Sequence, residues 1–528
     1  MSLVTGALGS TMPESSPRMA VRRIARAIPA LIGLACLGST ASALDHPDEP
    51  VLKEVTALLS ITDAAWIDRQ VINLAAANGD DPIVWREKIG RTLYLSNGYD
   101  GIDLTRPSLL GWRPGAAGLI GVFPIKDRKK FLDAFGVAPG GDGPLVRVGD
   151  SEGTIKLTQI HGEDHYEYRM MLTDDTAYLA RTPEECRQMS LHPLVLSNST
   201  IASFSAWGPF TGGLPTGIVT DVPDLSALVP QTHLAPTLMA LAATFAQPLL
   251  DQVTTFTWNL SPNANGATLS ADLQLTADGT LAAWLRAQSN QGSRLLPAVH
   301  NEGSAVLVYG QFSWQGQCET YGETSAADLK TKQANWTPEV DAAWRTVWSL
   351  LDRTGGFAWD LHFTGNDGWG ALFASEQSDA AEMAKRLVVL STNLQSTTAE
   401  AATINDVAAT RLNGGDKGNV LVSSDDRHLI IAEGSDAEAA SGVALSKLST
   451  PSPPTGANGL LVAVVDITRW VRHAWIGKLE DDGAKLPPMT ITAVAKAAHD
   501  SLHLDVQVPV ADLIALLNKL QNSKPQGP

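Results

Sequence analysis

Hydrophobic and polar residues alternate along two adjacent stretches of Thr254–Ala287. The first stretch alternates from Phe256 to Leu260, and the second alternates over 267–275 after an Asn265–Gly266 dipeptide. A period of two predicts strands with one buried and one solvated face, and Asn-Gly predicts a tight hairpin turn. Apolar residues at helical spacing come next. The stretch therefore predicts a strand–turn–strand–helix unit.

The same pattern recurs at Met489–Leu520, and Asp272-x-Gln274 has a counterpart in Asp505-x-Gln507. Aspartate doublets also recur, at Asp174–Asp175 and Asp425–Asp426. The spacing between matching features is 251 residues at the doublets and 233 at Asp272 and Asp505, so the order is kept while loop lengths differ. A long, drifting repeat excludes a short-period solenoid. We therefore expect an α+β fold of two duplicated lobes, each a mostly antiparallel sheet with packed helices.

Four segments are expected along the chain. Residues 1–43 form a signal peptide, 44–79 a helical preamble, 80–298 the first lobe and 299–528 the second lobe. The preamble is predicted to be helical because Val51–Leu59 and Asp63–Ala76 carry apolar residues at helical spacing.

The N-terminal segment has the features of an export signal. Basic residues at 22, 23 and 26 precede an apolar run at 29–38 and a small-residue site, Ala41-Ser42-Ala43. The run is shorter than the ~20 residues that a membrane span needs. A twin-arginine signal fits less well, because the apolar and Phe positions expected after Arg22–Arg23 are missing. A lipoprotein signal also fits less well, because Gly33 stands where the lipoprotein box has leucine. We expect a periplasmic or extracellular protein after cleavage near Ala43, with no transmembrane span.

The charge of the chain limits its partners. The net charge is −17, and removal of residues 1–43, with four basic and one acidic residue, makes it −20. So acidic a surface repels phosphate backbones, which excludes nucleic acid as a partner.

Four stretches resemble a group of secreted bacterial proteins of unknown function. They are GIDLTRPSLLGW at 101–112, GLIGVFPIKDRKKFLDAF at 118–135, DDTAYLARTPEE at 174–185 and DQVTTFTWNLSPNANGATLSADLQL at 251–275. The resemblance mainly covers 90–312 and implies the location and the fold. It brings no catalytic residues.

Ser151 lies in a sequence, Gly149-Asp-Ser-Glu-Gly153, that matches the nucleophile elbow of hydrolases. That elbow needs a strand before the serine and a helix after it. Residues 154–158 alternate as a strand instead, so a hairpin turn is the better interpretation.

Two histidine pairs have the i, i+4 spacing of helical zinc ligands, His161 with His165 and His499 with His503. Both fall at predicted hairpins, where the side chains would diverge, and no third ligand is identifiable. The sequence thus assigns no metal ligand, cofactor-binding residue or catalytic residue.

Tryptophans crowd one region of the second lobe, and Trp314, Trp336, Trp359 and Trp369 are candidates for a ligand-binding aromatic surface. Trp344 and Trp348 lie one helical turn apart, as in a packed core. Core packing is the favoured interpretation, because large aromatic side chains are mostly buried.

Cys186 and Cys318 are the only cysteines left after removal of the signal segment. An even pair in an oxidising compartment is a disulfide candidate, and this one would join the two lobes. Two separate buried thiols are the alternative.

Three functions remain open. The first is a non-enzymatic protein that binds a protein or glycan of the cell envelope or acts structurally. The second is a carrier of an apolar or glycan ligand between the lobes, which the tryptophans favour. The third is a secreted hydrolase that uses carboxylates. A non-enzymatic role without cofactor is favoured, since no nucleophile, base and metal converge in the sequence.

Overall fold

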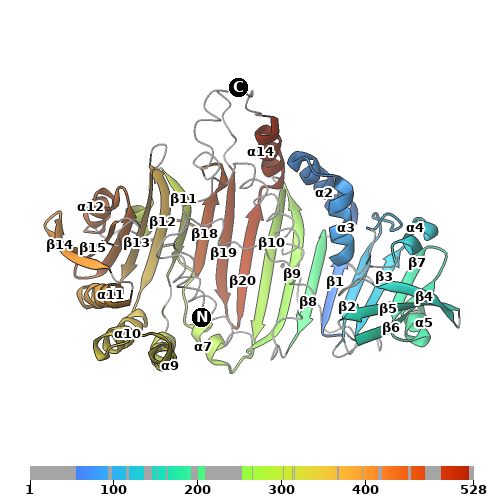
Figure 1. Cartoon of the computed structure of the whole chain (residues 1–528), viewed down its shortest axis with the longest axis horizontal. Helices are drawn as coiled ribbons and strands as arrows, with labels where there is room; N and C mark the ends of the chain where they lie inside the picture. Colours follow the sequence, from blue (N-terminus) through green and yellow to red (C-terminus); the bar gives the residue numbers. More distant parts are fainter. Residues whose placement is uncertain are drawn as a thin grey trace.

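One antiparallel β-sheet runs through the whole molecule (Figure 1), here described from a computed structural model. The described residues lie between 55 and 522, and the longer gaps among them are 114–117, 136–144, 192–199, 209–251, 414–418 and 470–488. The predicted signal peptide at 1–43 lies outside them.

The first half of the sheet comes from residues 57–275. Its strands are β1 (Ala57–Ile61), β2 (Ser108–Trp112), β3 (Leu119–Pro124), β4 (Val146–Ser151), β5 (Thr154–His161), β6 (Asp164–Leu172), β7 (Thr176–Ala180), β8 (Ala202–Trp207), β9 (Val253–Asn263) and β10 (Gly266–Leu275). They pair in the order β10–β9–β8–β1–β2–β3–β7–β6–β5–β4.

The second half comes from residues 304–508. Its strands are β11 (Ser304–Gly310), β12 (Gly356–Thr364), β13 (Gly368–Glu376), β14 (Thr398–Ile404), β15 (Val407–Asn413), β16 (Asn419–Ser424), β17 (His428–Gly434), β18 (Leu461–Asp466), β19 (Thr490–Ala498) and β20 (Ser501–Val508). They pair in the order β20–β19–β18–β11–β12–β13–β17–β16–β15–β14. Counted from the central pair outward, the two orders correspond strand by strand.

The helices occupy matching places in the two halves. Helices α2 (Ala64–Asn78) and α3 (Pro82–Thr92) follow β1, as α9 (Gln317–Lys332) and α10 (Pro338–Leu351) follow β11. In the same way, α4 (Arg128–Asp133), α5 (Pro183–Leu191) and α7 (Thr280–Arg286) correspond in order to α11 (Ala380–Leu394), α12 (Ala437–Leu448) and α14 (Val510–Asn522). The short helix α8 (Leu296–Val299) lies between the halves along the chain.

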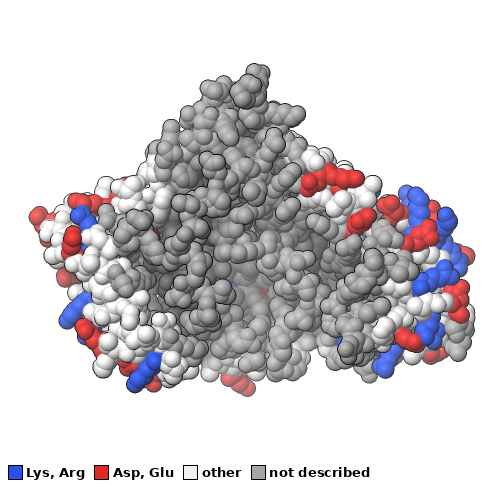
Figure 2. Space-filling view, viewed as in Figure 1, with Lys and Arg blue, Asp and Glu red and all other residues white. Residues whose placement is uncertain are grey.

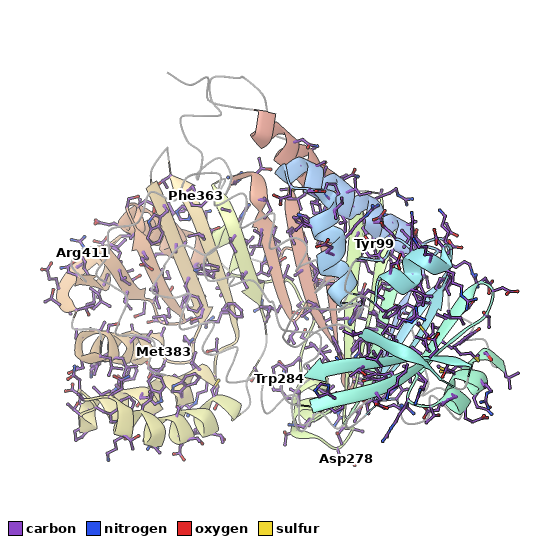
Figure 3. All side chains as sticks on the ribbon, turned by 45° about the vertical axis from the view of Figure 1, so that its right-hand side comes forward. Tyr99, Asp278, Trp284, Phe363, Met383 and Arg411 are labelled. Atoms are coloured by element: carbon purple, nitrogen blue, oxygen red, sulfur yellow. The ribbon has the colours of Figure 1, made fainter. Side chains whose placement is uncertain are left out.

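The halves meet edge to edge at β10 and β20, where Asp272 is directly opposite His503. Each half also sends its last helix toward the other: α14 packs against α2, and Trp284 of α7 donates a hydrogen bond to the carbonyl oxygen of Ser313. Figure 3 shows Trp284 near the centre of the molecule, between the two outer ends. The joint is therefore held by a strand ladder and by reciprocal helix contacts.

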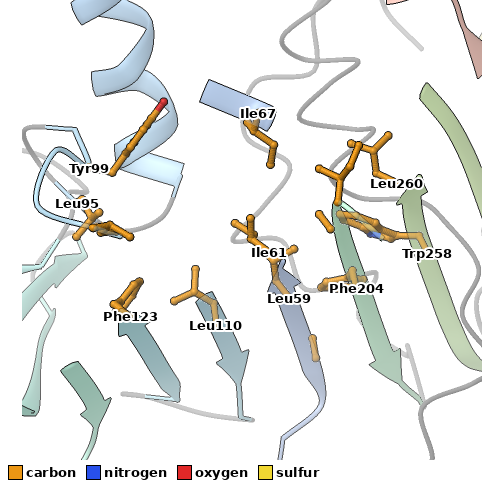
Figure 4. Close-up of a cluster of buried hydrophobic side chains, with 14 of the residues drawn as sticks. Leu59, Ile61, Ile67, Leu95, Tyr99, Leu110, Phe123, Phe204, Trp258 and Leu260 are labelled. Carbon is orange, nitrogen blue, oxygen red and sulfur yellow. The ribbon is translucent and has the colours of Figure 1, made fainter. Parts of the chain in front are cut away.

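Helices cover both faces of the first half. On one face, α2, α3 and α4 bury Val71, Trp85 and Phe131 in the main core. Figure 4 shows part of this core, with Leu59, Leu110, Phe123, Phe204 and Trp258 projecting from neighbouring strands. On the opposite face, α5 buries Cys186 and Met189 against Leu58, Leu109 and Ile120.

The second half has the same two-sided arrangement. Helices α10 and α11 pack on one face, where Val340, Met383 (Figure 3) and Ile431 meet. Helices α8 and α12 pack on the other face, where Leu295 and Leu445 contact Ile430. Ile430 and Ile431 are neighbours in β17, so their side chains point to opposite faces.

The α12 face changes from apolar to polar across the joint. Tyr309, Val462, Val494, Asp505 and Ser270 are paired in one row across five neighbouring strands, so they share that face. The row begins in the apolar cluster under α12 and ends at polar positions of β20 and β10. Charged side chains at the centre of the sheet are therefore confined to this face.

The expected α+β class with a mainly antiparallel sheet is confirmed. The helical preamble is wrong in part, because 57–61 is strand β1, with all five residues buried. A strand buried on both faces has no alternation, which explains the helical interpretation. The first half thus starts at β1, earlier than residue 80.

No helix among the described residues is long and apolar enough to cross a membrane.

Candidate functional site

The predicted tryptophan surface does not form from the residues that can be placed. Trp336 packs with the α10–α11 cluster, and its Nε1 donates to Asp341 at 3.0 Å. Trp359 and Trp369 belong to a different cluster, around Leu361. Trp359 is buried, with 7% of its surface exposed. Trp314 lies outside the described residues. Trp336 and Trp369 are partly buried side chains that pack against two separate clusters.

The disulfide between Cys186 and Cys318 is not formed, which corrects that expectation: both are free and buried. Cys186 lies in α5 and Cys318 in α9, and Figure 1 shows these helices toward opposite ends of the sheet. Burial raises the pKa of Cys186 to about 11, and it also raises that of Cys318, where Asp352 adds to the effect. Both thiols therefore stay protonated at neutral pH and behave as small apolar groups.

The strands around Ser151 follow the hairpin interpretation. Ser151 ends β4, and β5 begins at Thr154, so the strand–turn–helix context of a nucleophile elbow is missing. His161 and His165 lie on either side of the β5–β6 turn, with Ile160 opposite His165. His499 and His503 lie at the β19–β20 turn and in β20. No group of three potential metal ligands occurs among the described residues.

A buried histidine with a carboxylate on each ring nitrogen lies under α12. His362 Nδ1 is 2.6 Å from Asp360 Oδ2, and Nε2 is 2.9 Å from Asp436 Oδ2 at the start of α12. Burial alone would lower the pKa of His362, but the two carboxylates outweigh it and raise the pKa. A ring held on both nitrogens has no free position for proton transfer, so this cluster is structural.

A second histidine cluster lies on the polar face of the joint. His503 Nδ1 is 2.7 Å from Asp272 Oδ1, and Nε2 is 3.1 Å from Asp505 Oδ2. Burial opposes protonation, but Asp272 and Asp505 together raise the pKa of His503. This cluster joins β10 to β20 across the halves, and the two matching Asp-x-Gln sequences contribute one aspartate each.

An open pocket of about 1310 Å³ lies at one end of the second half. Its apolar part comes from α8 and from the end of α12, through Leu295, Ala298 and Leu448. Its charged part comes from the segments that precede α8, β12 and β17, from the end of β13 and from α12. The charged lining residues are Arg294, Arg353, Glu376, Asp425, Asp426, Arg427 and Lys447.

The basic side chains of this pocket have no carboxylate partner among the residues that the structure describes. None of Arg294, Arg353, Arg427 and Lys447 forms a side-chain hydrogen bond or ion pair with another described residue, and all four are exposed. Elsewhere on the molecule basic and acidic side chains lie side by side, as Figure 2 shows at both outer ends. Arg147–Asp150, Lys156–Glu167 and Arg187–Glu184 are ion pairs at the outer end of the first half.

His428 and Asp425 form a pair within the pocket wall. His428 Nδ1 is 2.9 Å from Asp425 Oδ2, while Nε2 has no hydrogen bond to another described residue. Burial would raise the pKa of Asp425, but hydrogen bonds from Arg427 N–H and from His428 outweigh it and lower the pKa. Asp425 is therefore an anion already satisfied by its own turn, and it does not neutralise the pocket's arginines.

Sequence reasoning missed this pocket. Its residues come from segments between 294 and 454, and only the Asp425–Asp426 doublet was singled out, as a marker of the repeat. Four basic residues at turns and helix ends are an ordinary sequence feature, and only the fold brings them together.

No protein family and no curated protein matches the chain. Solved structures of TP0453 in crystal forms I, III and IV are similar to it at a TM-score of 0.22 and 10–11% identity. They cover 42–44% of this chain and 97–99% of theirs. A likeness this weak carries no functional argument.

Proposed function

We propose that this protein is exported and serves outside the cytoplasm as a non-enzymatic binding protein, with the basic pocket of the second half as its ligand site. The observation that carries the proposal is the pocket itself, with an apolar floor and basic side chains free of described partners. Its volume of about 1310 Å³ exceeds the usual range of about 300–1,000 Å³ for small-molecule sites, so it suits a large ligand.

Three further features support the proposal that the protein is exported, duplicated and non-enzymatic. The N-terminal sequence has the order of an export signal. The common strand and helix order supports an origin by duplication of one α+β unit. The rings of His362 and His503 are held by carboxylates on both nitrogens, and the two thiols are buried, which removes these groups as catalysts. The carrier alternative placed its ligand between the lobes. The pocket instead lies within the second half, so a carried ligand would bind there.

A pocket-filling variant tests the proposal. Gly355 lines the pocket, and a Cβ there would meet only the flexible Glu376 side chain, with Oε2 at 2.8 Å. The Cβ of a larger side chain can therefore be placed at 355 if the Glu376 side chain moves, and Gly355→Trp is the pocket-filling variant. Val443→Trp is the matched control, because Val443 is exposed on α12 and is not among the pocket residues.

The probe is the small-molecule filtrate of the producing cell's envelope fraction, added to the purified protein. We expect thermal stabilisation of the wild type and of Val443→Trp, none of Gly355→Trp, and an unchanged filtrate by mass spectrometry. Equal stabilisation of all three proteins, or of none, would contradict the pocket as the binding site.

Acid–base catalysis is a second candidate, which the Asp425–His428 pair favours. Nδ1 is held by Asp425, so neutral His428 would present Nε2 as a base. Consumption of a filtrate component by the wild type, and its loss in His428→Gln, would replace the binding function with this one.

A further inference from the structure

We infer that the ligand of the basic pocket is a hydroxyl-rich molecule with more than one anionic group, such as an acidic oligosaccharide or a polyol phosphate. This inference rests on the proposed binding function and adds the chemical class of the ligand.

The positions of the basic side chains indicate more than one anionic group. Arg294 precedes α8, Arg353 precedes β12, Arg427 precedes β17 and Lys447 ends α12. The four charges thus reach the pocket from four separate elements. A single carboxylate can be bound by one arginine in a bidentate pair, so four dispersed cations are better matched by several anions.

The acidic side chains of the same pocket indicate hydroxyl groups. Glu376 and Asp426 line the pocket and form no side-chain hydrogen bond to another described residue. Carboxylates accept hydrogen bonds from hydroxyls but repel anions, so both kinds of group in one ligand satisfy the lining. A fatty acid would leave these two carboxylates next to its alkyl chain, at a cost in desolvation.

The matching place in the first half explains why binding should be confined to the second. Arg106 precedes β2 as Arg353 precedes β12, and Asp174–Asp175 precedes β7 as Asp425–Asp426 leads to β17. Arg106 Nη1 is 2.8 Å from Asp175 Oδ2, and Nη2 is 3.2 Å from Thr176 Oγ1. The corresponding arginine of the first half, Arg106, is therefore already bound to the turn before β7.

The test compares anionic probes with neutral probes that have the same number of rings. Hexagalacturonate is paired with neutral maltohexaose, and inositol hexakisphosphate is paired with myo-inositol; binding is measured by calorimetry on the mature protein. We expect binding of at least one anionic probe and none of its neutral partner. The two anionic arms distinguish uronate from phosphate chemistry.

A double variant, Arg353→Gln with Arg427→Gln, removes two pocket charges. Because a hydrogen bond between charged groups contributes about a factor of ten, we expect about a hundredfold weaker binding. The control is Arg69→Gln with Lys129→Gln, which lowers the net charge equally from exposed sites on α2 and α4. It should bind as the wild type does.

Equal weakening by the pocket and control variants would show non-specific attraction and overturn the inference. Stronger binding of a neutral probe would overturn the ligand class while leaving the pocket as a binding site. If none of the four probes binds, the inferred ligand class is also wrong. The comparison of Gly355→Trp with the wild type would still test the proposed binding function.

Discussion

The two halves share one order of strands and helices, but different residue types form the side-chain contacts at corresponding places. Beyond β2, Arg113 binds Glu185 of α5 through two hydrogen bonds of 2.7 and 3.2 Å. At the end of β12, His362 binds Asp436 at the start of α12. At the turn before β7, Asp175 binds Arg106, and at the turn before β17, Asp425 binds His428.

The two kinds of contact differ in whether the basic side chain can lose its charge. An arginine stays protonated at every physiological pH, whereas a histidine titrates between about pH 5 and 8. At the α5 contact the first half is therefore held by an arginine that stays charged, whereas at the α12 contact the second half is held by a histidine whose charge depends on pH. The common fold is compatible with either arginine or histidine at these places, because each contact needs only a hydrogen-bond donor and a carboxylate.

The largest expected effect comes from removal of the His362 ring. In His362→Leu, the carboxylates of Asp360 and Asp436 lose their shared partner, and Asp360 is fully buried. Breaking a buried pair costs roughly 3–5 kcal/mol, because a charge is left without compensation. Urea denaturation should show this loss, and hydrogen exchange should rise in peptides of α12.

A loss below about 1 kcal/mol would contradict a buried charge pair at this cluster. Ser446→Leu, at an exposed position of the same helix, is the control and should leave the midpoint unchanged.

A smaller effect is expected at Gly370, where β13 passes below this cluster. A Cβ added there would lie 2.2 Å from Asp436 Oδ1 and 2.5 Å from His362 Nε2. Gly370→Ala should cost roughly 1–3 kcal/mol, typical of overpacking, by forcing the pair apart. The combined Gly370→Ala and His362→Leu variant should lose less than the sum, because both changes break the same contact. An additive loss would place the strain elsewhere.

The sequence was sufficient for the β9–β10 and β19–β20 hairpins, because their strands alternate and a turn separates them. It was insufficient for β1, since Leu58 and Leu59 are buried on opposite faces and no alternation remains. Asp360-x-His362 has the spacing of two neighbours on one strand face, which is a readable signal. Its partner Asp436 lies 74 residues away, and nothing local in the sequence identifies that contact.

The corresponding pair of the first half should be less sensitive. Arg113→Leu leaves Glu185 with hydrogen bonds from the backbone N–H groups of Arg181 and Thr182, and Glu185 keeps 25% of its side chain exposed. Water and these donors compensate the carboxylate, so we expect a loss of about 1–2 kcal/mol. A loss equal to that of His362→Leu would remove the contrast between the halves.

The smallest effect is the response to pH, which separates the halves without any substitution. The pKa of His362 is raised above its ordinary 6.5, so the protonated ring binds more tightly in the folded state. Its contribution is complete below pH 6.5 and is lost as the pH rises through the raised pKa. Glu185 behaves oppositely: burial acts to raise its pKa, but Arg113 and two backbone donors lower it, so its contribution is lost only in acid.

Hydrogen exchange at about pH 5.5 and about pH 8.5, corrected for intrinsic rates, should show peptides of 428–448 less protected at the higher pH and peptides of 176–191 unchanged. Equal changes in both halves, or greater protection of α12 at the higher pH, would contradict the assignment of a charged His362.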